Sequence, residues 1–128
     1  MKSAEKSAKS LERRILHRVR EAVAAYRLIG PGDRILVALS GGKDSMALLH
    51  FLSVMRRSNN GLFDLKAVHV RMANVDYRTD LLQLKEYAEQ CGADFELLDA
   101  AFKPDEKQGR SACFLCSWTR RKALFNYA

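Results

Sequence analysis

Apolar residues recur in two patterns along this chain, as short continuous runs and as repeats at helical spacing. The short runs predict strands over residues 34–39, 65–70 and 94–98. The helical repeats predict helices over residues 10–28, 44–55, 77–91 and 117–127. Because the first two strands are joined by a helix long enough to cross a sheet, they should run parallel with a right-handed connection. The pattern therefore predicts a three-layer α/β fold, in which a parallel sheet of about three strands has helices on both faces.

Polar stretches divide this pattern into regions. Residues 1–10 are rich in Lys, Ser and Ala and are expected to fray. Gly30-Pro31-Gly32 ends the first helix. This break separates a basic N-terminal helix, residues 1–30, from the domain expected over residues 31–128. Residues 99–110 are polar and predict a loop.

The junction between the first strand and the second helix carries the strongest chemical signal, Ser40-Gly41-Gly42-Lys43-Asp44-Ser45. N–H groups in the first turn of a helix have no intrahelical partner, and the helix dipole favours an anion there. Glycine lets a phosphate approach the backbone closely. The spacing is neither a Walker A loop nor a dinucleotide fingerprint, because Asp44 follows Lys43 and no glycine stands at position 37. The alternative is a simple Gly-Gly turn capped by Ser40.

The net charge of +7 is concentrated at the two ends of the chain. Residues 1–27 carry eight Lys/Arg against three Glu, and residues 103–128 carry six against two acidic residues, whereas the middle is mildly acidic. Basic flanks around a nucleotide site indicate a polyanionic partner, most simply RNA, although basic charge can also serve solubility alone. The polar face of the first helix is either a solvated face or an RNA-facing one. Its cationic positions are Arg13, Arg14, His17, Arg18, Arg20 and Arg27.

A Cys-x-x-Cys motif, Cys113 to Cys116, opens the last helical stretch. This spacing puts both sulfurs on one side, and the helix N-terminus with Arg120 and Arg121 would lower the pKa of the thiols. Thiolates bind soft metals or exchange with disulfides, so three interpretations of the motif are possible: a zinc site, a redox pair and an iron–sulfur cluster. No second Cys-x-x-Cys or His pair completes four ligands, and incidental cysteines are the remaining alternative. Cys91 is expected to be a small buried residue.

The glycine-rich hexapeptide resembles the pyrophosphate loop, Ser-Gly-Gly-x-Asp-Ser, of the PP-loop ATPases. This resemblance implies that the chain binds ATP and cleaves it between the α- and β-phosphates, adenylating a substrate. Lys43 and Asp44 would be catalytic, Lys43 by offsetting negative charge and Asp44 by orienting the loop or helping to hold Mg²⁺. Residues 69–72, at the carboxyl end of the second strand, would flank the adenine and ribose, although His69 itself is better interpreted as a buried strand histidine. The implied ATP and pyrophosphate contacts are Ala38, Ser40, Gly41, Gly42, Lys43, Asp44, Ser45 and His69.

A second segment, about 70 residues further on, restricts the resemblance to one group of PP-loop enzymes. It reads Cys113-Phe114-Leu115-Cys116-Ser117-Trp118-Thr119-Arg120-Arg121. The two motifs together are similar to the tRNA 2-thiocytidine synthetases, PP-loop enzymes that replace the 2-oxygen of a tRNA cytidine with sulfur. The resemblance implies that Cys113 and Cys116 are two of three thiolate ligands of a [4Fe–4S] cluster. Ala112 stands where the family usually has Pro. The third family cysteine and a Gly-His-His-x-Asp-Asp segment do not occur in this sequence, so the chain is expected to be the N-terminal half of such an enzyme.

The predicted function is therefore ATP-dependent tRNA thiolation, with tRNA and a sulfur-donor protein such as a cysteine desulfurase as partners. A sheet of only three strands would leave an open edge, and a half-domain would expose apolar surface, which makes a homodimer a further expectation. One alternative is another PP-loop tRNA ligase, such as a lysidine synthetase, but the cysteine pair argues against it. Another is a catalytically incomplete fragment that binds ATP and tRNA.

The remaining sequence features concern location. No apolar run approaches the length of about 18 residues that a membrane span needs. The N-terminus is charged and has no apolar signal-peptide core. Three cysteines do not form a secreted disulfide framework, so the expected location is the cytoplasm.

Overall fold

The computed structural model describes residues 2–58, 62–72, 80–100 and 112–128, and the side chains of residues 2, 72 and 112–117 lie outside this description. The helices are α1 (Lys2–Tyr26), α2 (Lys43–Ser58), α3 (Leu81–Gln90) and α4 (Ala112–Tyr127). The strands are β1 (Arg34–Ala38), β2 (Asp64–Met72) and β3 (Asp94–Ala100). Helices and strands alternate along the chain after α1, as the apolar pattern predicted.

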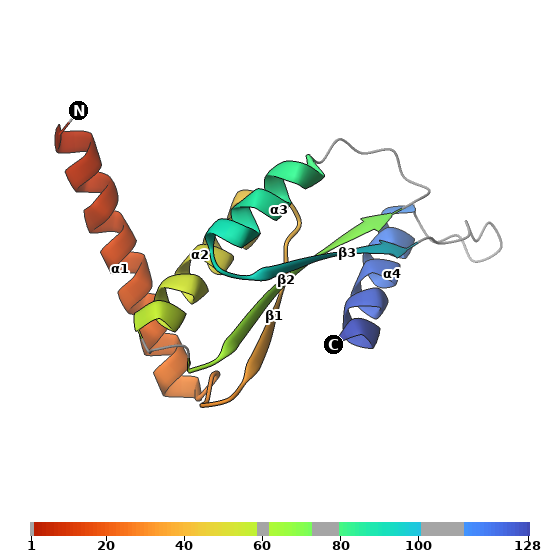
Figure 1. The fold of residues 1–128 in the computed structure, drawn as a ribbon, viewed down its shortest axis with the longest axis horizontal. Helices are drawn as coiled ribbons and strands as arrows, with labels where there is room; N and C mark the ends of the chain where they lie inside the picture. The colour runs from red at the N-terminus through yellow and green to blue at the C-terminus, as the bar shows by residue number, and fades with distance from the viewer. Residues whose placement is uncertain (1, 59–61, 73–79, 101–111) are drawn as a thin grey trace.

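The strands form one parallel sheet in the order β1-β2-β3. Arg34 of β1 pairs with Asp64 of β2, and Lys66 of β2 pairs with Asp94 of β3. The amino ends of the strands therefore lie at one end of the sheet, and their carboxyl ends lie at the other. Strand β1 forms one edge of the sheet, as Figure 1 shows.

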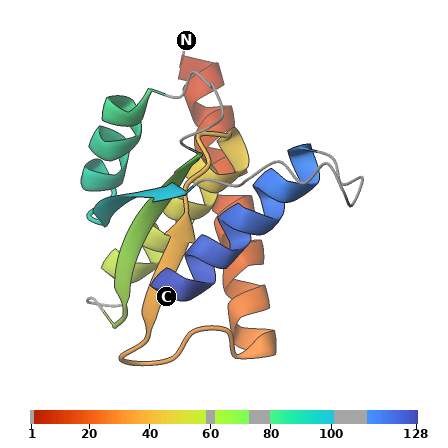
Figure 2. The ribbon, with the colours of Figure 1, turned by 90° about the vertical axis from the view of Figure 1, so that its right-hand side faces the viewer.

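Helices cover both faces of the sheet, which confirms the predicted three-layer arrangement (Figures 1 and 2). On one face, α2 and α3 bury the main core, in which Leu49, Leu52 and Leu84 pack with Val37 and Ala67 of the strands. On the other face, Val68 and Val70 of β2 pack against Ala123, Leu124 and Tyr127 of α4. Successive strand residues point to opposite faces, so β2 supplies both cores.

Helix α1 lies outside these layers and packs on α2. Glu12 contacts the His50 ring at 2.7 Å, and Arg20 donates to the Ser58 hydroxyl at 3.2 Å. Both pairs are 38 residues apart, so the two helices run in the same general direction along this contact. The half-buried positions on the same side of α1 include Leu16, Val19 and Val23. Leu11 and Ile15, which belong to the apolar repeat of the sequence, are 50% and 38% exposed.

Element boundaries depart from the predicted ones at several places, and helices α2 and α4 are longer than predicted because they run on to Ser58 and begin at Ala112. Residues 2–10 continue helix α1 instead of fraying, because Lys, Ala and Glu are strong helix formers. Strands β2 and β3 run on to Met72 and Ala100, so the first two residues of the predicted 99–110 loop are strand. The rest of that loop lies outside the described residues. Helix α3 begins at Leu81, behind an N-cap at Asp80 whose carboxylate accepts the Gln83 N–H at 3.1 Å.

Candidate nucleotide-binding site

The glycine loop, residues 40–45, lies where strand β1 meets helix α2. Strand β1 ends at Ala38, and the Leu39 N–H donates to the Val68 carbonyl at 2.7 Å, which ties the start of the loop to β2. Leu39 is 1% exposed, whereas Ser40 to Asp44 are exposed. The loop therefore faces solvent from a fixed base at the carboxyl end of the sheet, where doubly wound proteins bind their ligands.

Two serine hydroxyls hold the loop in shape. The Ser45 hydroxyl donates to the Gly42 carbonyl at 3.0 Å and accepts the Ser40 N–H at 3.1 Å. The Ser40 hydroxyl accepts the Gly42 N–H at 3.2 Å and lies 3.0 Å from the Ser45 hydroxyl. Because a hydroxyl carries one hydrogen, the set is consistent when Ser40 donates to Ser45 and Ser45 donates to Gly42. Both serines of the motif thus have a structural use that a simple capped turn would not need.

The remaining backbone donors of the loop point to no protein acceptor. Within the part of the chain that the structure describes, the N–H groups of Gly41, Lys43, Asp44 and Ser45 make no hydrogen bond. Gly41 has φ 92°, a left-handed conformation that side chains rarely adopt. Four free N–H groups at a helix N-terminus, beside the exposed Lys43 ammonium, form an anion site of the kind that binds phosphate.

Two side chains from neighbouring elements fix the backbone on either side of the loop. His69 of β2 is 3% exposed, and its Nδ1 lies 2.7 Å from the Leu39 carbonyl. A carbonyl can only accept, so Nδ1 carries the proton and donates. Tyr87 of α3 donates its hydroxyl to the Met46 carbonyl at 2.9 Å. Burial, and secondarily the Cys91 thiol, raises the pKa of Tyr87, which keeps the phenol protonated as a donor.

The structure brings most of the predicted nucleotide contacts together. Ala38 ends β1, and the glycine loop follows directly. His69 lies behind the loop, buried against its backbone, which agrees with its interpretation as a buried strand histidine. Its contact with adenine or ribose stays a prediction, and part of the segment that follows it lies outside the described residues. Sequence reasoning missed Tyr87, since nothing in a helical repeat distinguishes a tyrosine that reaches a carbonyl 41 residues away.

The cysteine motif lies elsewhere in the chain. Cys113 and Cys116 lie in the first two turns of α4, and their side chains are outside the description. Cys91 is the C-cap of α3 and is half-buried beside Tyr87 and the main core, so it was only partly correct to expect a buried residue. Among the described residues, no group of three His, Cys, Asp or Glu side chains is placed to hold a metal ion.

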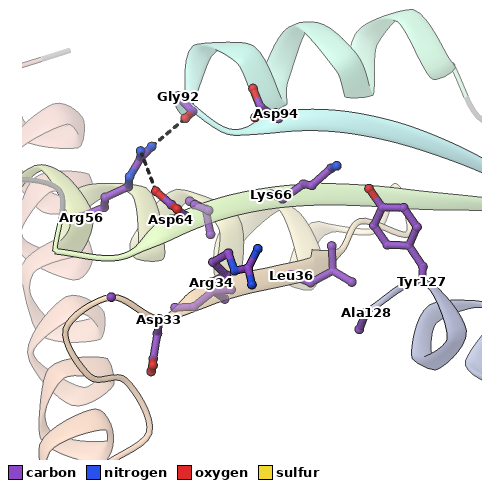
Figure 3. A pocket seen from close by; sticks show the side chains of 13 residues that line it. Asp33, Arg34, Leu36, Arg56, Asp64, Lys66, Gly92, Asp94, Tyr127 and Ala128 are labelled. Carbon is purple, nitrogen blue, oxygen red and sulfur yellow. Dashed lines mark hydrogen bonds and ion pairs between the residues drawn. The ribbon is translucent and has the colours of Figure 1, made fainter.

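A hollow of about 930 Å³ lies at the opposite end of the sheet (Figure 3). Residues at the amino ends of the strands and the end of α4 line it. Its charged groups are largely occupied: Arg56 donates to the Phe63 and Gly92 carbonyls, each at 2.9 Å, and Lys66 pairs with Glu96 at 3.0 Å. The polar groups around this hollow therefore serve mainly to stabilise the fold.

Comparison with known proteins agrees with the geometry of the loop. The sequence model of the PP-loop domain matches residues 8–105, and the chain belongs to that family. Within it, the chain is 38% identical over 120 residues to the tRNA-cytidine(32) 2-sulfurtransferase of Xanthomonas campestris, covering 92% of this chain and 40% of the relative. It is 34% identical over 131 residues to the enzyme of the same name from Erwinia tasmaniensis, covering 99% of this chain and 42% of the relative.

A solved structure supports the same assignment of fold. The U34-tRNA thiolase NcsA from Methanococcus maripaludis, determined with its [4Fe-4S] cluster, superposes with a TM-score of 0.62 at 26% identity. The match covers 77% of this chain and 34% of the thiolase. The chain thus spans about two fifths of the curated relatives and a third of this structure. No helix in the described ranges is long and apolar enough to cross a membrane.

Proposed function

We propose that the chain binds ATP at the glycine loop and takes part in the ATP-dependent thiolation of a tRNA cytidine. The observation that carries ATP binding is the group of four N–H donors at the start of α2, beside Lys43, that have no acceptor among the described residues. The relatives' name, tRNA-cytidine(32) 2-sulfurtransferase, supports the choice of substrate and reaction. The proposed setting is the cytoplasm, where thiols stay reduced.

In this proposal the loop binds the pyrophosphate part of ATP. The N–H groups of residue 41 and residues 43–45 donate to phosphate oxygens, as charge-assisted bonds that are stronger than neutral ones. The Lys43 ammonium stabilises the negative charge that develops when the bond from the α-phosphorus to the bridging oxygen breaks. Asp44, exposed in the first turn of α2, helps to hold Mg²⁺. His69 and Tyr87 position the backbone on either side of the loop, and His69 is also the predicted contact with adenine or ribose.

The proposed reaction has two displacements. The 2-oxygen of the cytidine attacks the α-phosphorus, pyrophosphate leaves, and the base becomes adenylated. Sulfide, which thiols release from a persulfide of the donor protein as they are oxidised to a disulfide, then attacks carbon 2, and AMP leaves with the original oxygen. The proposed partners are tRNA, a sulfur-donor protein such as a cysteine desulfurase, and a second copy of the chain next to the open edge of β1.

Cys113 and Cys116 are the residues that would hold a [4Fe–4S] cluster. Their positions, three residues apart near the start of α4, suit two thiolates of one cluster. When bound, the cluster supplies an iron site that carries sulfur.

The first test measures ATP binding by calorimetry. Ser40→Ala with Lys43→Ala should lower ATP affinity by more than about 100-fold, because the loop loses both a hydroxyl that shapes it and its cation. Arg57→Ala with Ser58→Ala is the matched control, since it removes a cation and a hydroxyl from the other end of α2. Unchanged affinity in the loop variant contradicts the site.

The second test measures the reaction. The purified chain is supplied anaerobically with iron, sulfide, ATP and tRNA, and AMP release and nucleoside mass spectra are recorded. Formation of AMP and 2-thiocytidine supports the proposed reaction. Binding of ATP and tRNA without AMP favours a binding unit that lacks the catalytic step, and contradicts catalysis by this chain.

A further inference from the structure

Helix α1 carries an uncompensated row of cations. Lys6, Lys9, Arg13 and Arg20 are exposed, and in an α-helix, which advances about 100° per residue, these positions fall within about 60° of one another. They form a straight row about 21 Å long, which we call the basic stripe. Among the described residues, no Lys or Arg of α1 takes part in an ion pair.

The acidic residues of α1 have other partners, which explains why the stripe keeps its charge. Glu12 pairs with His50 of α2 at 2.7 Å, and Glu21 pairs with His17 at 2.9 Å. Arg20, at one end of the stripe, donates to the neutral Ser58 hydroxyl and keeps its charge. Two of the three carboxylates of the helix are therefore engaged with histidines, away from the basic stripe.

The arrangement of α1 leaves the stripe open along its length. Helix α2 is the neighbour that α1 packs on, and Figure 1 shows the N-terminal part of α1 extending away from the sheet. Because α1 runs along α2 in the same general direction, the stripe leads from the Ser58 end of α2 toward the end where the glycine loop lies.

The opposite side of α1 does not suit a membrane surface. A groove there is lined by Leu11, Ile15, Val19 and Ala22, with Arg14 and Arg18 at its border, and the neighbouring apolar residues Leu16 and Val23 are half-buried on the side that packs on α2. An interfacial membrane helix needs a continuous apolar face. A row of unpaired cations about 21 Å long suits the backbone of a nucleic acid, in which charges repeat at short, regular intervals.

We infer that the basic stripe of α1 binds the phosphate backbone of the tRNA. The choice of tRNA rests on the proposed function, whereas the charge and geometry of the stripe do not. The contacts position the RNA and read no sequence, so they should appear chiefly as salt-dependent affinity.

Two variants with the same change of charge test this inference. Lys9→Gln with Arg13→Gln removes two cations from the stripe, and Arg14→Gln with Arg18→Gln removes two from the other side of the helix. Gln is nearly as good a helix former as Lys and Arg, and circular dichroism checks that α1 is kept. tRNA affinity is measured by fluorescence anisotropy over a salt titration.

The stripe variant should bind tRNA roughly tenfold more weakly at low salt, and its slope of log affinity against log salt should fall by about 1.5. The control should change the slope by less than half as much. Equal effects in both variants, no effect in either, or no tRNA binding by the unaltered chain would overturn the inference. Tighter binding to anionic phospholipid vesicles or to polyglutamate than to tRNA would overturn it as well.

ATP binding in the same samples separates this inference from the proposed function. Both variants should keep the ATP affinity of the unaltered chain, since the substitutions lie on α1 and not in the glycine loop. Loss of the stripe effect with intact ATP binding overturns the inference alone. Absence of ATP binding in the unaltered chain overturns the nucleotide site and leaves the stripe measurement standing.

Discussion

The two ends of strand β1 hold polar groups in opposite states of hydrogen bonding. At the amino end, Arg56 satisfies the carbonyls of Phe63 and Gly92, and the Gly32 N–H donates to the Leu62 carbonyl at 2.9 Å. At the carboxyl end, four N–H groups of the glycine loop have no acceptor among the described residues. The amino end has a hollow of about 930 Å³, yet its polar groups are mostly engaged with one another (Figure 3).

This difference shows that the size of a hollow is a poor guide to a binding site here. Polar groups that already pair inside the protein stabilise the fold and gain little from a ligand. Donors that are exposed, fixed in position and unpaired gain a great deal when an anion arrives. The glycine loop satisfies all three conditions because Ser40 and Ser45 hold its shape while His69 and Tyr87 fix its flanks.

The largest expected difference between the two ends comes from straining one glycine at each end of β1. Gly41→Ala places a side chain at φ 92°, which costs about 1–2 kcal/mol of strain or turns the loop's N–H groups away. We expect ATP affinity to fall by about 100-fold, which corresponds to about 2.7 kcal/mol. Calorimetric titration with ATP measures this loss.

Gly32→Ala is the control, because Gly32 also has a positive φ, 81°, and a Cβ there would meet no atom within 4 Å. It should lower stability by a similar amount and leave ATP affinity unchanged. Equal losses of ATP affinity in the two variants would mean that general destabilisation, and not the glycine loop, governs binding.

Much of the fold could be predicted from the sequence because local pattern and tertiary packing agree. The apolar runs that predicted the strands are the residues buried in the two cores, such as Val37, Leu65 and Val68. The predicted end of β3 was wrong because the last residues of this strand depend on a partner. Asp99 by itself is typical of a loop, but Arg71 pairs with it from the neighbouring strand at 2.7 Å.

The candidate site could also be predicted only in part from the sequence. The glycine loop was predictable because its chemistry lies in six consecutive residues. The groups that fix it were not, since the contact of His69 with Leu39 spans 30 residues and that of Tyr87 with Met46 spans 41. A local pattern can suggest that a histidine in a strand is buried, but only the packing of β1 beside β2 shows which carbonyl it reaches.

The positioning role of His69 gives a prediction of intermediate size. His69→Leu removes the Nδ1 donor and leaves the Leu39 carbonyl without it, which should cost about 1–3 kcal/mol of stability. ATP affinity should fall about tenfold, because the loop loses a fixed point at its start. His69→Asn, whose short amide can donate near the Nδ1 position, should recover part of both losses. Urea unfolding and ATP titration measure the two quantities.

Val68→Ala is the control that separates the positioning role of His69 from its contribution to stability. Val68 is fully buried on the other face of the same strand, so its truncation should destabilise the chain to a similar degree through lost packing. ATP affinity should stay at the level of the unaltered chain. If Val68→Ala weakens ATP binding as much as His69→Leu does, the bond from His69 has no specific effect on the loop.

The smallest expected effect belongs to the amino end of the sheet, where Tyr127 and Lys66 bond to Glu96. The bond from Tyr127, followed by that from Lys66, lowers the pKa of Glu96 below its usual 4.5. Because the pKa of Glu96 is lower in the folded state, the ionised carboxylate stabilises the fold above about pH 4.5. This stabilisation is lost as the pH falls through the folded-state pKa. Tyr127→Phe should therefore lower the urea midpoint slightly at pH 7, and the difference should shrink below about pH 4.5. ATP affinity should be unchanged at every pH, because this contact lies away from the glycine loop. A difference in urea midpoint that stays constant down to acid pH would mean that Tyr127 acts through packing on β2.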